Sequence, residues 1–226
     1  MCGIVGIYLK TKKLEKNLGK LLSGMLNNME SRGPDSAGFA IYKDEGKKVY
    51  KFSLCINDLN FNNFKKEISK KIKKAKFIQI SDHVILKTFE KPNKVIEIIN
   101  STFPKVSIVG YGRSIEIFKQ VGNPKDVVKK FKLDNFSGTH GIGHTRMATE
   151  SAITTDGSHP YSTGEDECLV HNGSLSNHNN LRRALTKKGN TFHSENDTEV
   201  AAGYVSNSLS NNKSLKDTLT SGLKDL

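Results

Sequence analysis

The chain has 226 residues and a formal net charge of +12, and 35% of its residues are hydrophobic. No apolar run approaches the roughly 20 residues of a membrane helix, and the first ten residues lack the features of a signal peptide. The three cysteines are widely spaced and odd in number, which argues against a disulfide framework and for a reducing compartment. We therefore expect one soluble, cytoplasmic domain over residues 1–226.

The positive charge is concentrated in the middle of the chain. Residues 41–140 contain 21 Lys and Arg against 10 Asp and Glu, and 20 of these 21 basic residues are Lys. Arg suits bidentate contacts with phosphate, whereas Lys is typical of solvated surfaces. A Lys-rich surface is therefore favoured over a nucleic-acid site, and we predict neither a nucleic-acid nor a membrane partner.

The first third of the chain shows a strand, a helix and a second strand. Residues 2–9 are short, apolar and β-branched, which predicts a buried strand. Leucines and methionines at helical spacing over 14–29 predict a helix. The turn residues of "SRGPDSAG" end that helix, and "AGFAIY" predicts the next strand.

The Lys-rich middle shows the same alternation of strands and helices. Alternating apolar residues over 47–55 predict a strand, and apolar residues spaced over 64–75 predict a helix. The segments "KFIQISDHVILKTF" and "KVSIVGYG" predict strands on either side of a helix near 94–100. "PKDVVKKFKL" predicts a short helix that begins with Pro124.

The last third is rich in Gly, His, Thr, Ser and Asn. Short apolar segments at 141–144 and 168–171 predict strands that carry polar residues at their ends. Ser176 is a candidate N-cap of one helix, and Asn196 or Asp197 is a candidate N-cap of another. "SLKDTLTSGLKDL" has the pattern of a final helix.

Cys2 follows the initiator Met directly. If Met1 is removed, Cys2 carries a thiol and a free α-amine, whose pKa of about 7.7–8 makes it a usable base at neutral pH. Nucleophile and base then belong to one residue. The alternative is a small cysteine buried in an apolar strand, and position alone does not choose between the two.

Six motifs occur in order: "CGIVGIY", "SRGPDSAG", "GHTRMAT", "SHPYS", "LVHNGSLSNHNNLR" and "ENDTEV". Together they resemble the class II glutamine amidotransferases, the N-terminal-nucleophile (Ntn) glutaminase family. The resemblance covers residues 1–42 and 138–205. It implies an α+β fold, a four-layer αββα Ntn-hydrolase sandwich with Cys2 at the end of a central strand. It also implies hydrolysis of L-glutamine to L-glutamate and ammonia through a Cys2 thioester.

The same resemblance suggests where the oxyanion of the reaction is held. "HNG" offers the Asn172 side-chain amide and the Gly173 backbone N–H, which match the family's oxyanion hole. Such preorganised donors are worth about 10²–10³ in rate. An Asn-Gly pair is also a common tight turn, and on its own that interpretation would be preferred.

Glutamine carries an α-carboxylate and an α-ammonium, and the motifs contain a matching charge for each. Arg146 matches the family residue that grips the carboxylate, and Asp197 matches the one that pairs with the ammonium. A surface Arg and a plain helix N-cap are the alternatives. Thr149 and His159 match positions near the substrate, although Thr149 also suits a turn.

Two further residues, Arg32 and Asp35, match a loop that flanks the family's active site. For them an ion pair or a turn is as good an interpretation as substrate contact. Six of the seven histidines fall in 140–193, but none shows the repeated spacing of zinc ligands, and the family needs no metal for this half-reaction. We predict no metal and no cofactor.

The chain departs from the best-known branch of the family. Glucosamine-6-phosphate synthases have "HTRWATHG" where this chain has "HTRMATES", and residues 43–137 form a large α/β insertion by comparison with that branch. The wording "MATESAITTDGSHPYST" resembles the glutaminase subunits of archaeal-type glutamate synthase and N-methylglutamate synthase. The implied partner is a separate, ammonia-accepting synthase subunit, of a flavin-bearing kind. The family's last strands normally follow residue 205, so the C-terminal end is expected to be incomplete.

Three alternative functions stay open. The chain could be an Ntn amidase for another substrate, although the pairing of Arg146 with Asp197 suits a free amino acid. The chain could be the glutaminase part of an amidophosphoribosyltransferase or of a glucosamine-6-phosphate synthase-like enzyme. It could also be a non-catalytic regulatory subunit that docks through the Lys-rich segment.

Overall fold

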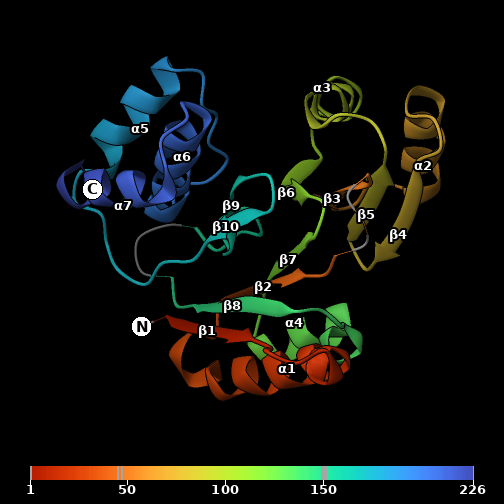
Figure 1. Cartoon of the computed structure of the whole chain (residues 1–226), viewed down its shortest axis with the longest axis horizontal. Coiled ribbons are helices and arrows are strands. Elements are labelled where there is room, and N and C mark those ends of the chain that lie inside the picture. Colours follow the sequence, from red (N-terminus) through yellow and green to blue (C-terminus); the bar gives the residue numbers. More distant parts are fainter. Residues whose placement is uncertain (1, 45, 47, 149–151, 226) are drawn as a thin grey trace.

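The computed structural model describes residues 2–44, 46, 48–148 and 152–225 (Figure 1). The chain folds into two antiparallel four-stranded sheets, a two-stranded hairpin and seven α-helices within these ranges. The architecture is therefore mixed, with both helices and antiparallel sheets.

The first sheet joins the N-terminal strand to strands from the middle of the chain. Its order is β1-β8-β2-β7, with all neighbours antiparallel. The strands are β1 (Gly3–Tyr8), β8 (His140–Arg146), β2 (Ser36–Tyr42) and β7 (Ile115–Val121). Strand β2 is buried along nearly its whole length because it lies between β8 and β7.

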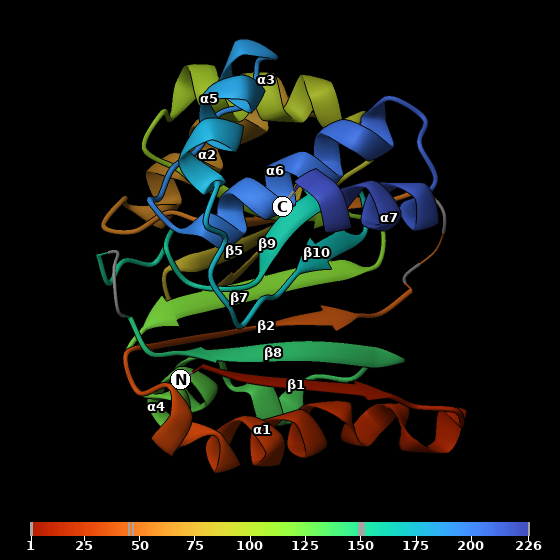
Figure 2. The ribbon, with the colours of Figure 1, turned by 90° about the vertical axis from the view of Figure 1, so that its left-hand side faces the viewer.

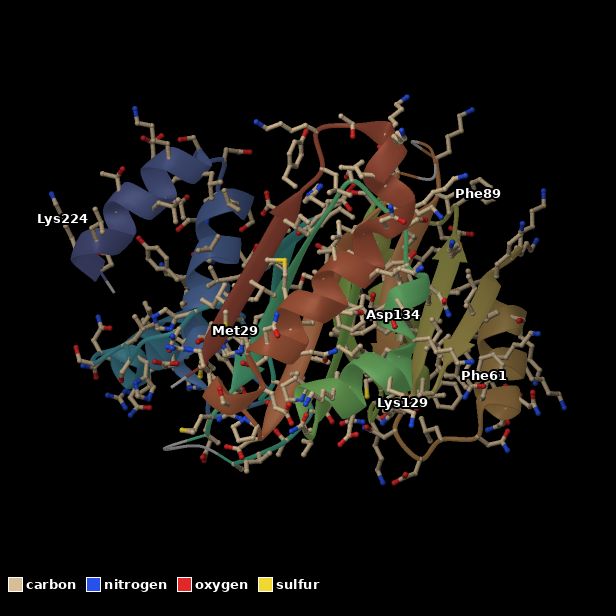
Figure 3. All side chains as sticks on the ribbon, turned by 90° about the horizontal axis from the view of Figure 1, so that it is seen from below. Met29, Phe61, Phe89, Lys129, Asp134 and Lys224 are labelled. Carbon is tan, nitrogen blue, oxygen red and sulfur yellow. The ribbon has the colours of Figure 1, made fainter. Side chains whose placement is uncertain are left out.

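Two helices cover the outer face of this sheet, α1 (Leu18–Asn28) and α4 (Pro124–Phe131), and both lie in front of it in Figure 3. The predicted helical spacing is confirmed, because Leu18, Leu22 and Leu26 are buried on one side of α1. They pack with Phe39 of β2 and Phe131 of α4 in one apolar cluster.

The Lys-rich middle builds most of the second sheet, whose order is β4-β5-β3-β6. Its strands are β3 (Tyr50–Cys55), β4 (Lys76–Ile80), β5 (His83–Thr88) and β6 (Ser107–Gly112). Helices α2 (Phe61–Lys71) and α3 (Pro92–Thr102) cover this sheet, and Figure 1 shows them on its outer side. Phe64 and Ile68 of α2 and Val95 and Ile99 of α3 fill a separate apolar cluster with Phe52.

The last third forms the hairpin β9 (Tyr161–Gly164) and β10 (Glu167–Leu169), followed by α5 (His178–Lys187), α6 (Asp197–Ser210) and α7 (Leu215–Asp225). The bridge between Tyr111 and Glu165 places the hairpin beside β6. In Figure 2 the order from bottom to top is α1, the first sheet, the strands β9 and β10, and then α5 and α6. The hairpin therefore lies between the first sheet and the helices α5 and α6 in this view.

Several local expectations differ from the structure. Strands β7 and β9 were not expected, and "KFIQISDHVILKTF" forms a hairpin of two strands, β4 and β5. The prediction of Ser176 as an N-cap is wrong, because the N-cap of α5 is Asn177. Among the described residues, no helix combines the length and the apolar character that crossing a membrane requires.

Residues of the predicted insertion 43–137 contribute to both layers of strands. Strands β3 to β6 build the second sheet, whereas β7 and α4 belong to the first sheet and its covering helices. The boundaries of the insertion remain a prediction.

Candidate active site

The first and eighth strands bring Cys2 and Arg146 together. Strands β1 and β8 are antiparallel with Gly3 opposite Thr145, so the residue before β1 lies next to the last residue of β8. The Cys2 Sγ is 3.8 Å from the Met147 carbonyl oxygen. Two residues that are 144 positions apart in the sequence are therefore neighbours at one end of the sheet.

The Asn172–Gly173 corner lies against the same end of the sheet. The Asn172 side-chain amide donates to the Cys2 carbonyl oxygen at 3.1 Å, and the Arg32 Nε donates to the same oxygen at 3.3 Å. A Cβ at Gly173 would lie 2.6 Å from the His171 ring, so glycine is needed for this close approach. An amide has two N–H groups, so Asn172 can use its second one toward a ligand.

A cavity of about 610 Å³ opens at this corner. Its lining comes from the residue before β1, the end of β8, the segment before β9, the segment between β10 and α5, and the starts of α5 and α6. The lining contains Cys2, Arg146, His159, Gly173 and Asp197, and also Met147, His171, Ser174, His178, Asn179, Arg182, Glu195, Asn196 and Thr198. Five of the seven predicted site residues thus line one cavity, Asn172 borders it through Cys2, and Thr149 lies outside the described residues.

Arg146 is 4% exposed, and its guanidinium Nη1 donates to the Ala152 carbonyl at 3.2 Å. Its backbone carbonyl accepts from the Asp35 N–H, and the Asp35 carboxylate accepts from the Ala148 N–H at 2.8 Å. Asp35 therefore braces the backbone from Arg146 to Ala148. Arg32 itself is exposed, so a buried ion pair does not account for it.

Asp197 is the first residue of α6. Its carboxylate accepts from the Leu175 N–H at 2.8 Å and from the Thr198 hydroxyl at 3.2 Å. The N-cap is Asn196, whose side chain accepts from the Thr198 N–H at 2.9 Å, so of the two candidate caps Asn196 is confirmed. A carboxylate in the first turn is also favoured by the helix dipole.

Two stacked histidines form the buried wall of the site. The rings of His144 and His159 stack with 3.9 Å between their centroids, and His144 Nε2 bonds to the His171 carbonyl oxygen at 3.0 Å. Burial lowers the pKa of His144 to about 4 and the pKa of His159 well below its usual value. Both rings are therefore neutral at pH 7, whereas Arg146 and Arg182 bring positive charge to the cavity.

Arg182 and Asn196 line the cavity but were not predicted as site residues from the sequence. Arg182 of α5 donates to the Ser194 carbonyl at 2.7 Å and to the Asn196 carbonyl at 3.2 Å, which fixes the segment before Asp197. These contacts join a side chain to distant backbone carbonyls. Arg182 ends the motif "LVHNGSLSNHNNLR", but the sequence alone does not indicate which carbonyls its guanidinium meets.

The described residues contain one group of three side chains that could offer metal ligands, Cys55, Asp82 and His83. It lies outside the cavity. Asp82 already bonds to the His83 ring at 3.0 Å and to the Lys130 ammonium at 3.0 Å, so its charge is satisfied within the protein. Burial raises the pKa of the Cys55 thiol to about 11, which keeps it protonated at pH 7.

The cavity combines a thiol, a guanidinium and a carboxylate with an amide and a backbone N–H. A thiol beside preorganised N–H donors suits attack on an acyl carbon, because the donors stabilise the oxyanion that forms. A separate cation and anion in one small cavity suit a zwitterionic ligand such as a free amino acid.

The comparisons with known proteins point to one family. Residues 134–208 match the family model described as a glutamine amidotransferase domain. A protein of Rhizobium meliloti named glutamine amidotransferase-like protein GlxB is 48% identical over 229 residues, an alignment that covers all of this chain and 76% of the relative. A protein of Methanothermobacter thermautotrophicus named putative glutamine amidotransferase is 32% identical over 241 residues, which is all of this chain and 78% of the relative.

Partial similarity extends to a larger group of enzymes. The glutamine–fructose-6-phosphate aminotransferase (isomerizing) of Bradyrhizobium diazoefficiens is 40% identical over 98 residues, which is 43% of this chain and 16% of that protein. The similarity to such enzymes therefore concerns a short part of each of them.

Proposed function

From the premise that this chain belongs to the glutamine amidotransferase family, we propose that it hydrolyses L-glutamine to L-glutamate and ammonia with Cys2 as nucleophile. The observation that carries the proposal is the single cavity lined by Cys2, Arg146, Gly173 and Asp197, with the Asn172 amide 3.1 Å from the Cys2 carbonyl. We assign this site to the class II, Ntn type, and the stacked layers to its αββα sandwich.

The proposed reaction begins with removal of Met1. The Cys2 thiol gives its proton to the freed α-amine, and the sulfur attacks the side-chain amide carbon of glutamine. The Asn172 amide and the Gly173 N–H stabilise the oxyanion. When the oxyanion collapses, the C–N bond breaks and the leaving nitrogen takes the proton as ammonia. Water then attacks the thioester, which releases glutamate and restores the thiol.

Substrate recognition follows from the charges of the cavity. Arg146 pairs with the α-carboxylate of glutamine and Asp197 with its α-ammonium, and His159 lies along the bound substrate. The substrate-binding role of Thr149 is proposed from its motif alone. The Asp197 carboxylate is oriented by the Leu175 N–H and the Thr198 hydroxyl before substrate arrives. Such orientation lowers the cost of ordering the site on binding.

The decisive experiment compares Cys2→Ala with Cys168→Ala. Cys168 is a matched control because it is also a free cysteine, but its thiol is 3.4 Å from the Tyr42 hydroxyl and does not line the cavity. We expect Cys2→Ala to abolish glutamate release and Cys168→Ala to retain it. Intact mass should show wild-type protein without Met1 and with one adduct of a glutamine-analogue electrophile. Full turnover by Cys2→Ala would refute the assignment.

We further propose that the ammonia passes to a separate synthase subunit, as in glutamate synthase-like systems, with a flavin on that subunit. Support comes from the relatives that cover this whole chain, which are named for the amidotransferase alone, whereas the aminotransferases match between 43% and 53% of it. Copurification of the tagged chain with a yellow, flavin-containing subunit would support this assignment. Synthesis of an amino sugar phosphate by the purified chain would favour the alternative branch.

A regulatory, non-catalytic role is a further alternative. It predicts a retained Met1 or a Cys2 that does not react with the glutamine analogue, so the same intact-mass measurement distinguishes the two roles.

A further inference from the structure

Lys119 of β7 is a buried lysine that reaches from the first sheet into the segment before β9. It is 5% exposed, and its ammonium donates to the Asp156 carbonyl at 3.0 Å and to the Ser158 carbonyl at 2.8 Å. The ammonium also lies 4.4 Å from the centre of the Tyr161 ring. A buried cation is costly unless its donors are used, and here they are used on backbone carbonyls.

Asn196 holds the carbonyl between these two. Its side-chain amide donates to the Gly157 carbonyl at 3.2 Å, while its side-chain oxygen caps α6. Three consecutive carbonyls, at positions 156 to 158, are thus fixed by two buried side chains from different elements. The backbone of this segment has little freedom to shift without breaking charge-assisted or buried hydrogen bonds.

The fixed segment packs directly on the predicted carboxylate-binding group. A Cβ built at Gly157 would lie 3.3 Å from the Arg146 Nη1, so the backbone of the segment lies beside the guanidinium. The same Nη1 donates to the Ala152 carbonyl earlier in the loop, and His159 of the cavity wall follows Ser158 directly. The position of Arg146 therefore depends on the position of this loop.

We propose that Lys119 is a positioning residue for substrate binding: by holding the carbonyls of Asp156 and Ser158 it keeps Arg146 oriented toward the α-carboxylate of glutamine. The inference rests on the proposed glutaminase function. Lys119 itself does not line the cavity and does not touch the substrate. A displacement of about 1 Å at such a group can cost up to about 10²-fold in efficiency.

Lys51 of β3 provides a matched control. It is also fully buried, and its ammonium donates to two backbone carbonyls, those of Lys43 at 3.1 Å and Ser114 at 2.8 Å. It pairs in addition with Glu116 at 3.0 Å. None of these residues lines the active-site cavity, so Lys51→Met removes a comparable set of contacts at a distance from Arg146.

The test measures how fast Cys2 is alkylated by two probes. The probe 6-diazo-5-oxo-L-norleucine carries the α-carboxylate and α-ammonium of glutamine, whereas iodoacetamide carries neither. We expect Lys119→Met to slow the first probe about tenfold relative to the second, and Lys119→Arg, which keeps the charge, to recover part of the loss. Lys51→Met should leave the ratio of the two rates unchanged.

Each outcome has a distinct meaning. If the diazo probe does not label wild-type Cys2, the proposed function fails. If wild-type Cys2 is labelled and Lys119→Met keeps the wild-type ratio, the function stands and the positioning role is wrong. Equal slowing of both probes would also overturn the positioning role, because general damage to the site affects both. If Lys119→Met does not fold, Lys119→Gln carries the same expectation with a smaller change in ratio.

Discussion

The two buried lysines, Lys51 and Lys119, lie in two different regions of the protein, and each donates hydrogen bonds to two backbone carbonyls. Lys51 joins β3 to the start of β7, and Glu116 supplies a carboxylate within bonding distance. Among the described residues, Lys119 has no carboxylate within 4.0 Å, and its hydrogen bonds go to loop carbonyls. The carbonyl partners of Lys51, at Lys43 and Ser114, directly adjoin the ends of β2 and β7, whereas the carbonyl partners of Lys119 lie in the longer segment before β9.

The same contrast holds for the larger regions around them. Lys51 lies on β3 of the second sheet. This sheet and its helices enclose an apolar cluster that contains Phe52, Phe64 and Ile99, each 0% exposed. The segment from β9 to α6 is held largely by side chains that bond to backbone carbonyls, such as Arg182 to Ser194 and Asn196 to Gly157. Apolar packing tolerates small rearrangements, but directed hydrogen bonds fix atoms within tenths of an ångström. The geometry of the site should therefore be more sensitive to single polar substitutions.

Among single substitutions in the site region, Asn172→Ala is expected to have the largest effect. If the Asn172 amide stabilises the oxyanion, its loss should lower kcat about 10²–10³-fold. The change removes an exposed side chain, so the melting temperature should change little. Steady-state release of glutamate measures kcat, and Lys51→Met serves as the control that lowers stability without this loss. A kcat within twofold of wild type would show that Asn172 has no such role.

These differences also explain what the sequence could predict. The periodic apolar residues of α1 and of "AGFAIY" follow from local burial, and both elements form as expected. Strand β7 was missed because "SIEIFKQV" mixes apolar and charged residues, and its Lys119 is buried only because distant carbonyls meet it. The N-cap of α5 is one residue later than expected, which is within the usual uncertainty of helix ends.

The pH dependence of stability offers the next largest effect. Burial lowers the pKa of Lys119 to about 8, from 10.5 for an ordinary lysine. Between these values the unfolded chain binds more protons than the folded one, so this group makes stability rise with pH. The free energy of unfolding of wild type relative to Lys119→Met should increase by up to about 3 kcal/mol from pH 8 to pH 10.5. Urea melts across this range measure it.

Other charged and titratable groups face Lys119 and share this environment. They lie on the segment before β9, on β9, and on α6, β3 and β5: Asp156, His159, Tyr161, Glu199, Cys55 and His83. Because these groups are present in both proteins, their contributions largely cancel in the difference between wild type and Lys119→Met. If the free energies of unfolding of wild type and Lys119→Met changed in parallel over this pH range, the lowered pKa of Lys119 would be contradicted.

A pair of helix caps sharpens the comparison further. Asn196 caps α6 in the site region and Asn60 caps α2 in the Lys-rich region, each by accepting a backbone N–H near the helix start. Each change to Ala should cost about 1 kcal/mol of stability. Asn196→Ala also frees the Gly157 carbonyl, so its KM for glutamine should rise about tenfold, whereas Asn60→Ala should leave KM unchanged. Equal KM values for glutamine in the two variants would show that the 156–158 segment does not affect substrate binding.

The motifs predicted part of the candidate site, but not the residues that hold it in place. The motifs identified Cys2, Arg146, Gly173 and Asp197, which the fold brings to one cavity although they are dispersed along the chain. Of their supports, Lys119 belongs to no motif, and Arg182 ends the motif "LVHNGSLSNHNNLR" without a role that the motif assigns to it. A bond to a backbone carbonyl demands a donor at one point in space and no particular sequence around it.

The smallest expected effect concerns the exposed lysines, which test whether burial is what distinguishes Lys51 and Lys119. Lys70 of α2 is 58% exposed and pairs with Glu67 at 2.6 Å, one helical turn away. Water and salt screen such a pair, and holding two long side chains in place costs entropy, so its net contribution is small. We expect Lys70→Ala to leave glutamine turnover and the urea midpoint within experimental error of wild type at 0.15 M salt. A loss comparable to that of Lys51→Met would mean that the Lys-rich surface takes part in the fold, and the contrast between buried and solvated lysines would no longer hold.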